Sequence, residues 1–382
     1  MSRAPSTYWR LSAFYLFYFA SLGTLMPYWP LYLQHRGLSA PAIGNLMAVL
    51  MATKILAPNI WGWIADHTGR RMVIIRVATA LAALSFAGVF AAHGLLGLAL
   101  VMAAFSFFWN AALPQFEATT MNHLGSQPHR YSMIRLWGSI GFILTVAGVG
   151  WALDTSSPAL LPPVILALYV GIFAASVLAP ADAGPPGRAR HASLRDVLRQ
   201  PEVAALLAVC FLMQASHGPY YTFFTIYLGD HGYTKAVIGQ LWALGVVAEI
   251  GVFLVMHRWL PRFGPRRLLL ASLALTTVRW YLIAEYPAHL APILAAQTLH
   301  AASFGVYHAV AIHLIHEFFT GPHQGRGQAL YSSVSFGAGG AVGSMASGYL
   351  WSSAGPTWTY LAAAMTSALA WVVAYRGLHA RP

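Results

Sequence analysis

Ionisable side chains stand inside the long apolar stretches of this sequence, where they would hold or exchange charge away from water. Placing one charge in hydrocarbon costs about 3 kcal/mol or more, so each such residue is a candidate for function. Buried cations bind anions, carboxylates carry protons, and histidines exchange protons near neutral pH. The residues concerned are Lys54, Arg135, Arg279, Glu117, Glu249, His217, His300 and His308.

The elements that must position them are apolar helices. The chain has 382 residues, of which 58% are hydrophobic and only 8% are charged, whereas soluble domains carry about 25% charged residues. This composition excludes a cytosolic enzyme, a disordered protein and a nucleic-acid-binding domain. It predicts an all-α membrane protein with twelve transmembrane helices. We expect these near residues 10–33, 41–65, 72–92, 95–122, 131–153, 159–179, 203–228, 236–257, 267–286, 289–317, 327–350 and 357–376.

The basic residues predict the orientation of these helices. The formal net charge is +12 with 22 Lys and Arg residues, and most of them fall in the loops and tails on the N-terminal side. The opposite loops hold only Arg36 and Lys235. Cytoplasmic loops are the ones enriched in Lys and Arg, so we expect both termini in the cytoplasm. The positive charge then reflects topology and contact with membrane lipids, and it indicates no nucleic-acid partner.

An internal repeat indicates two related halves. At one constant offset the first part of the chain matches the second, in helices and in loops. The matched pairs include Tyr32 and Tyr227, Gly37 and Gly232, Ile43 and Ile238, and Gly69 and Gly264. Parallel six-helix repeats of this kind relate the halves of some transporters. We therefore expect pseudo-symmetric six-helix bundles at 1–179 and 201–382, joined by a cytoplasmic linker at 180–200.

The loop after the second predicted helix resembles the signature loop of the major facilitator superfamily. The segment reads Gly62-Trp-Ile-Ala-Asp66-His67-Thr-Gly69-Arg70-Arg71, and His67 departs from the basic residue of that pattern. In a gating loop, Gly62 would allow close helix approach and Gly69 would permit the turn. Asp66 would meet a helix N-terminus or an arginine across the domain interface, and the two arginines would hold the loop at the inner leaflet.

A narrower resemblance covers most of the chain. The segment 131–141 is similar to the fifth helix of the lactose-permease-like and nucleoside-symporter-like branches of this superfamily. Segments 232–249, 278–280 and 297–300 are similar to the 3-phenylpropionate permease group. The resemblance implies the major facilitator fold and proton-coupled symport in a bacterial inner membrane. It implies a monomer without a cofactor.

Glu117 and Arg135 lie on consecutive predicted helices at matched distances from the turn near Ser126. At a constant helical rise they reach the same depth, which predicts an ion pair. In lactose-permease-like proteins a Glu and an Arg at this separation bind substrate. The resemblance therefore implies that Arg135 receives an anionic or hydroxylated group and that Glu117 positions it. The alternative is a purely structural ion pair.

A second pair comes from the repeat, because Lys54 and Glu249 occupy equivalent positions in the two halves. One hypothesis is that they face each other across a central cavity and couple protonation to access. The alternative is that each residue pairs locally within its own bundle.

Glu249, Arg279 and His300 resemble the proton-handling cluster of lactose permease. The chain has Ser303 where that family has a glutamate, so another residue must carry the proton. Glu249 is the first choice, because an apolar site favours a protonated carboxyl group. His217 and His308 are the second choice, although buried histidines are more often structural.

Aromatic and polar residues on the same helices are candidates for lining the cavity. Aromatic faces suit a flat apolar ligand, although most aromatics of a membrane protein serve packing or the interfacial belts. The polar residues would reach substrate or bond a neighbouring helix. The set comprises Tyr15, Tyr18, Phe107, Trp109, Trp137, Phe142, Tyr220, Tyr221, Asn110 and Gln214.

Together these features predict a proton-coupled symporter that imports a small aromatic carboxylate such as 3-phenylpropionate. Arg135 would bind the carboxylate with help from Lys54 or Arg279, and Glu249 would carry the proton. Symport of a sugar or nucleoside is the alternative, and a drug exporter, a membrane-embedded enzyme and a channel fit less well. The spacing of His313, His316 and Glu317 also occurs in metal sites, but we interpret these residues as an interfacial polar cluster.

Overall fold

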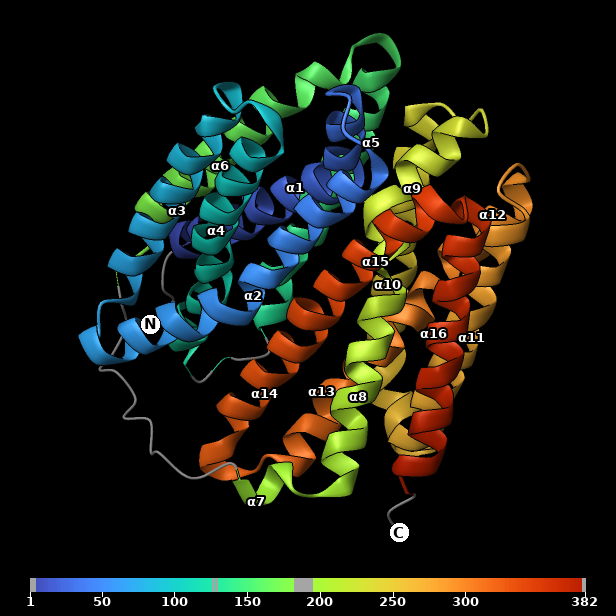
Figure 1. Cartoon of the computed structure of the whole chain (residues 1–382). Helices are drawn as coiled ribbons and strands as arrows, with labels where there is room; N and C mark the ends of the chain where they lie inside the picture. The colour runs from blue at the N-terminus through green and yellow to red at the C-terminus, as the bar shows by residue number, and fades with distance from the viewer. Residues whose placement is uncertain (1–4, 126, 128–129, 182–194, 380–382) are drawn as a thin grey trace. The chain divides into compact units, whose positions relative to one another are not determined.

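The computed structural model describes residues 5–125, 127, 130–181 and 195–379, and these residues form helices without any strand (Figure 1). The α-helices are α1 (Pro5–His35), α2 (Ala40–Thr68), α3 (Arg71–Ala87), α4 (Gly94–Leu124), α5 (Tyr131–Thr155), α6 (Leu161–Leu178), α7 (Arg195–Leu198), α8 (Pro201–Ser216), α9 (Gly218–Asp230), α10 (Lys235–Phe263), α11 (Pro265–Glu285), α12 (Leu290–Thr298), α13 (Tyr307–Phe318), α14 (Gln324–Ser332), α15 (Gly340–Ser353) and α16 (Pro356–Gly377). Two π-helical stretches, η4 (Ala301–Val306) and η6 (Ser333–Gly339), interrupt longer helical runs. Short 3₁₀ turns are η1 (Gly88–Phe90), η3 (Pro158–Leu160) and η5 (Gly321–His323).

Ten helical segments of the described residues are long and apolar enough to cross a membrane. This makes the chain a multi-pass membrane protein, because about 20 apolar residues span a bilayer. Helix α1 and the run from α14 to α15 are also long, but they are not among the ten. The first is rich in tyrosine and the second in glycine and serine, which lowers their hydropathy. The predicted number of twelve spans is therefore not confirmed.

The chain divides into two compact units. Unit 1 comprises Met1–Leu38 and Leu56–Ala189, and unit 2 comprises Ser39–Ile55 and Arg190–Pro382. The boundary between Ala189 and Arg190 falls within the predicted linker at 180–200. Residues 182–194 of that linker lie outside the described residues. The division passes through α2, so the first part of this helix is grouped with the second half of the sequence.

Small residues explain why the first part of α2 belongs to unit 2. A Cβ atom on Gly44 would lie 2.7 Å from the carbonyl oxygen of Ser344 in α15. A Cβ atom on Gly348 would lie 2.6 Å from the carbonyl oxygen of Ala40. These distances are too short for any side chain, so the two helix backbones touch directly. Glycine at these positions permits the close packing that apolar helices use in membranes.

The repeat reappears in the geometry of the helices. Helices α2 and α10 each contain 29 residues, and they begin and end at residues that the repeat pairs. The loop glycines match as well. Gly37 and Gly232 have φ angles of 77° and 85°, while Gly69 and Gly264 have 67° and 76°. Such left-handed turns favour glycine, because a Cβ atom would clash with the backbone.

Unit 2 surrounds its polar residues with apolar packing. A hydrophobic core joins α8, α11, α13 and α16, with Leu206, Leu273, Tyr307 and Ala370 among its buried residues. Helices α11 and α16 run side by side in Figure 1 and pack together along much of their length. Helix α11 thereby carries Arg279 into the interior. The run α12–η4–α13 passes beside it and supplies His300 and Ser303.

Candidate functional site

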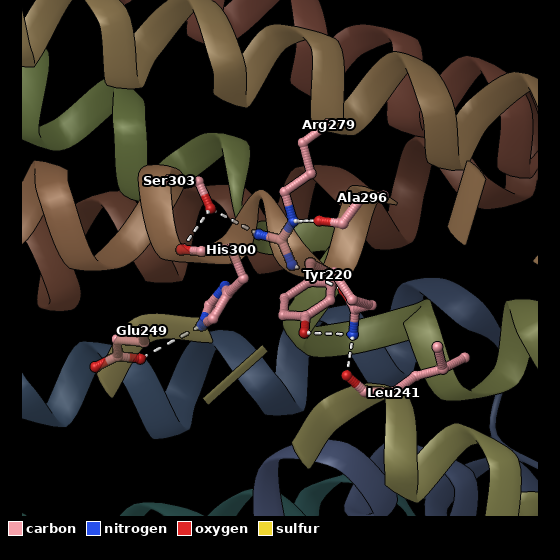
Figure 2. A network of polar contacts seen from close by, with 8 residues as sticks. Tyr220, Leu241, Glu249, Arg279, Ala296, His300 and Ser303 are labelled. Atoms are coloured by element: carbon pink, nitrogen blue, oxygen red, sulfur yellow. Dashed lines mark hydrogen bonds and ion pairs between the residues drawn. The ribbon is translucent and has the colours of Figure 1, made fainter. Parts of the chain in front are cut away.

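A fully buried guanidinium forms the centre of the polar network in unit 2. Arg279 donates three hydrogen bonds, from Nε to the Ala296 carbonyl at 3.0 Å, from Nη1 to Ser303 Oγ at 2.9 Å and from Nη2 to Gln297 Oε1 at 3.2 Å (Figure 2). Its Cζ atom lies 4.2 Å from the centre of the Tyr220 ring. Every acceptor is neutral, so dipoles and an aromatic face hold this charge.

Gln297 ties this network to two other helices. Its side-chain Nε2 donates to Tyr220 Oη at 3.2 Å and to the Leu241 carbonyl at 2.9 Å. The same side chain accepts from Arg279, so one fully buried amide satisfies three groups from α9, α10 and α11. A buried polar network of this kind is stable when each member has a partner. Gln297 therefore fixes where the guanidinium lies.

The carboxylate nearest to this network is reached through a histidine. His300 Nε2 lies 3.7 Å from Glu249 Oε2, and both side chains are mostly buried. Figure 2 shows the His300 ring between the Arg279 network and Glu249. The Nδ1 atom of His300 has no hydrogen-bond partner among the described residues. The structure thus brings together Glu249, His300 and Arg279, with Ser303 bonded to the arginine directly.

Two other predicted residues of unit 2 lie at the break between α8 and α9. His217 is fully buried, and its Nδ1 atom lies 2.8 Å from the Met213 carbonyl. Its Nε2 atom and the Nε2 atom of Gln214 have no partner in the part of the chain that the structure describes. The His217 ring packs against Tyr221 at 5.8 Å and against Trp280 at 4.9 Å.

Lys54 and Glu249 do not form the ion pair that their equivalence in the repeat suggests. No ion pair between them occurs in the described ranges, and the Lys54 ammonium lies 6.0 Å from the centre of the Phe336 ring. His308 contacts a different group, because its Nδ1 atom lies 2.9 Å from Tyr331 Oη. The hydrogen-bonded pair His308–Tyr331 was not anticipated.

Unit 1 holds a second candidate site around Arg135. The Arg135 Cζ atom lies 3.7 Å from the centre of the Phe19 ring and 5.9 Å from that of Tyr15. Glu117 accepts a hydrogen bond of 3.2 Å from Tyr131 Oη. The ion pairs among the described residues do not include one between Glu117 and Arg135. The predicted direct pair is therefore wrong, because Arg135 lies on an aromatic face and Glu117 bonds a phenol.

The guanidinium of Arg135 makes no hydrogen bond to any described residue, in contrast to that of Arg279. Arg135 is also half-buried, whereas Arg279 is fully buried. An arginine held by stacking keeps its N–H donors available for a carboxylate or a hydroxyl group. Arg135 can thus bind a ligand, while Arg279 already uses three of its donors on neighbouring helices.

The aromatic residues predicted for the cavity in unit 1 mainly pack against one another. Tyr18 stacks on Trp109 with ring centres 4.9 Å apart, and Tyr15 Oη donates to Thr120. Trp137 Nε1 donates to Tyr8 Oη at 2.9 Å. Phe142 and Asn110 are buried within the unit. Among them, Tyr15 is the one that contacts Arg135.

The loop between α2 and α3 forms a local ion pair. Arg71 Nη2 donates to Asp66 Oδ1 at 2.7 Å, and both side chains are partly exposed. Gly69 takes the left-handed conformation that the turn requires. A Cβ atom on Gly62 would lie 3.4 Å from Gln115 Nε2, which is ordinary contact. Arg70 is exposed at the start of α3.

The model of the MFS_1 like family matches residues 8–362. The chain belongs to this family. A curated relative, the probable 3-phenylpropionic acid transporter of Escherichia coli (strain K12), is 29% identical over 350 residues, which cover 91% of each chain. The maltose permease of Geobacillus stearothermophilus is 29% identical over 340 residues, covering 88% of this chain and 86% of the relative.

Solved structures of transporters share the fold. The nucleoside transporter NupG has a TM-score of 0.83 and 15% identity, covering 98% of this chain and 100% of its own. The POT family transporter PepTSo has a TM-score of 0.80 and 11% identity, covering 98% of both chains. The MFS_1 like protein is therefore a major facilitator secondary transporter and not an enzyme.

The sequence did not identify several residues of the two candidate sites. Gln297 lies within a stretch that resembles a permease group, but the sequence did not predict its hydrogen bond with Arg279. Phe19 and Tyr131 were not among the candidate residues, although they contact Arg135 and Glu117. For Tyr131 and Gln297 the available signal was a position about one helical turn from Arg135 and from His300, which is common for polar residues in membrane helices. Phe19 had no such signal.

Proposed function

We propose that this transporter is a proton-coupled symporter that imports a small aromatic carboxylate such as 3-phenylpropionate. The probable 3-phenylpropionic acid transporter, similar over 91% of both chains, supports this substrate class. The proposal includes twelve spans in two six-helix bundles, at 1–179 and 201–382, in a bacterial inner membrane. The distribution of Lys and Arg supports cytoplasmic termini.

The observation that carries the proposal is the contrast between the two membrane arginines. Arg135 stacks on Phe19 at 3.7 Å and has no hydrogen-bond acceptor among the described residues. A carboxylate would supply two acceptors in the plane of its guanidinium, in the bidentate arrangement that gives both strength and orientation. Arg279 is fully buried and already donates to three neutral acceptors, so it acts as a fixed positive charge.

The surroundings of Arg135 also favour an aromatic acid. Phe19 and Tyr15 lie against the guanidinium, so an aryl ring next to the bound carboxylate would meet aromatic neighbours. Offset or edge-to-face ring contacts contribute about 0.5–1.5 kcal/mol each beyond simple burial. Lys54 is the proposed assisting cation, and its ammonium lies 6.0 Å from the centre of the Phe336 ring.

Glu249 is the proposed proton carrier of the symport. Its carboxylate faces His300, which separates it from the buried Arg279 charge. When Glu249 is ionised, it partly balances that charge. When Glu249 binds a proton, that balance is lost and the protein carries one more positive charge, which favours binding of an anion. Proton binding and anion binding would then strengthen each other, as linked equilibria require.

A binding measurement tests the proposed substrate. Purified protein is titrated with 3-phenylpropionate and, in parallel, with its neutral amide, and thermal stability is recorded. We expect the acid to stabilise the protein, the amide to do so less, and Arg135→Ala to lose the response to the acid. Equal stabilisation by acid and amide, or a full response in Arg135→Ala, would contradict the assignment.

Symport of a sugar is the second candidate. The maltose permease similar to this chain supports it. Glu117 also supports it, because this half-buried carboxylate accepts a bond from Tyr131 and has further acceptor capacity for hydroxyl groups. The same titration with maltose and with nucleosides decides between the candidates. A response to these ligands that needs Glu117 would favour the hydroxylated substrate.

A further inference from the structure

Three rings in unit 2 form a column along the run α12–η4–α13. His300, Phe304 and His308 are each four residues apart. The His300 and Phe304 rings lie 5.6 Å apart with an interplanar angle of 18°, and the Phe304 and His308 rings lie 5.6 Å apart at 13°. The π-helical stretch η4 explains the alignment, because its wider i to i+5 turn places residues four apart more nearly in line.

Each histidine of the column has its own protonatable partner. His300 Nε2 faces the Glu249 carboxylate at 3.7 Å, and His308 Nδ1 lies 2.9 Å from Tyr331 Oη. The two partners come from different helices, Glu249 from α10 and Tyr331 from α14. The column therefore has a proton-holding pair at each end and a phenyl ring between them.

The surroundings of the second pair contain aromatic rings and one cation. Phe336 of η6 lies 6.0 Å from the His308 ring and 5.8 Å from the Tyr331 ring. The Lys54 ammonium of α2 lies 6.0 Å from that same Phe336 ring. At the other end, the ionisable groups around His300 are Glu249, Arg279, His217 and Tyr220, whose ring lies 5.8 Å from the His300 ring.

We propose that Glu249–His300 and His308–Tyr331 are two separate proton-holding sites and that Phe304 is the insulator between them. A phenyl ring has no lone pair and no exchangeable hydrogen, so it cannot pass a proton from one imidazole to the other. This inference rests on the proposed proton coupling and assigns a residue that enforces it. A transporter must prevent protons from crossing without substrate, and a continuous chain of imidazoles would let them cross.

Replacing the insulator tests the proposal without any substrate. Phe304→His places a third imidazole between the two existing ones. The protein is reconstituted into liposomes with a pH-sensitive dye inside, and proton entry is followed under an imposed membrane potential. We expect a several-fold faster leak than in the wild type. Phe304→Leu, which cannot relay protons, is the matched control and should stay as tight as the wild type.

Two more variants complete the test. Adding His308→Gln to Phe304→His should return the proton leak to the wild-type level, because the second proton-holding site is then missing. Phe304→Ser leaves room for water beside the unpartnered Nδ1 atom of His300, so it should leak as well. If Phe304→His and Phe304→Ser fold with wild-type thermal stability and remain tight, the proposal is overturned. A leak in Phe304→Leu would overturn it too.

The outcome is distinguishable from failure of the proposed symport. If Phe304→His leaks protons but the wild type shows no proton-coupled uptake, the symport proposal is contradicted and the role of Phe304 as insulator is supported. If Phe304→His does not leak protons but the wild type shows proton-driven uptake, the role of Phe304 as insulator is contradicted and the symport proposal is supported.

Discussion

The guanidinium of Arg279 donates a 2.9 Å hydrogen bond to the hydroxyl of Ser303 and none to a carboxylate among the described residues. A fully buried cation with neutral partners is costly, because solvation by water is lost and no opposite charge replaces it. The interactions that remain therefore carry more weight than ordinary hydrogen bonds. They also leave Glu249, reached through His300, as the nearby group whose charge can vary.

Ser303→Ala should destabilise the protein. It removes the acceptor for Nη1 of a buried charged group, and such bonds contribute about 1.5–3 kcal/mol. Thermal unfolding in detergent measures the effect as a lowered midpoint. Thr298→Ala is the matched control, because this exposed hydroxyl bonds only the Leu294 carbonyl of its own helix. An equal loss in both variants would contradict the special role of Ser303.

Glu249→Gln should abolish pH-driven accumulation of substrate but leave the exchange of internal for external substrate intact. The amide is fixed in a neutral form, as is a protonated Glu249, so substrate binding should survive. The variant cannot release a proton, and we expect it to lose pH-driven accumulation while it still exchanges internal for external substrate. Its exchange should also vary less with pH than that of the wild type. Accumulation at the wild-type level would assign the proton to another residue.

Gly44→Ala should disturb the contact between α2 and α15. The added Cβ atom would lie 2.7 Å from the Ser344 carbonyl oxygen, so one backbone must shift. Overpacking of this kind costs about 1–3 kcal/mol, and the thermal midpoint should fall. Gly251→Ala in α10 is the control, because a Cβ atom there meets nothing within 4 Å. Its midpoint should stay the same or rise.

Asp66→Asn should affect transport more than stability. The Asp66–Arg71 pair is partly exposed, and exposed pairs contribute only about 0–1 kcal/mol. We therefore expect a thermal midpoint close to that of the wild type. A slower uptake rate at unchanged substrate affinity would indicate a role in the conformational cycle. Wild-type uptake would show that the loop needs only the turn at Gly69.

Helix periods and the repeat predicted much of the fold. Lys54 and Glu249 do occupy matching positions of α2 and α10, and the paired loop glycines take matching left-handed turns. The number of spans was harder to predict, because Gly and Ser in α14–α15 serve close packing and weaken the hydropathy signal. The grouping of 39–55 with unit 2 depends on the α2–α15 contact, which no composition reveals.

The two sites were predictable to different extents. Resemblance to a known cluster placed Glu249, Arg279 and His300 together, and the structure brings their side chains together, although their role in proton coupling stays a prediction. Helix spacing placed Glu117 and Arg135 at one depth but could not give their rotamers. Arg135 stacks on Phe19 and Glu117 accepts from Tyr131, so the two side chains do not bond each other directly. Side-chain choice depends on neighbours from other helices, which spacing alone does not specify.

Uptake of labelled 3-phenylpropionate into proteoliposomes under an imposed pH gradient tests the central claim most directly. The account predicts accumulation that requires the gradient, collapses when a protonophore is added, and is absent in Arg135→Ala. Uptake that is indifferent to the gradient, or that persists in Arg135→Ala, would contradict it.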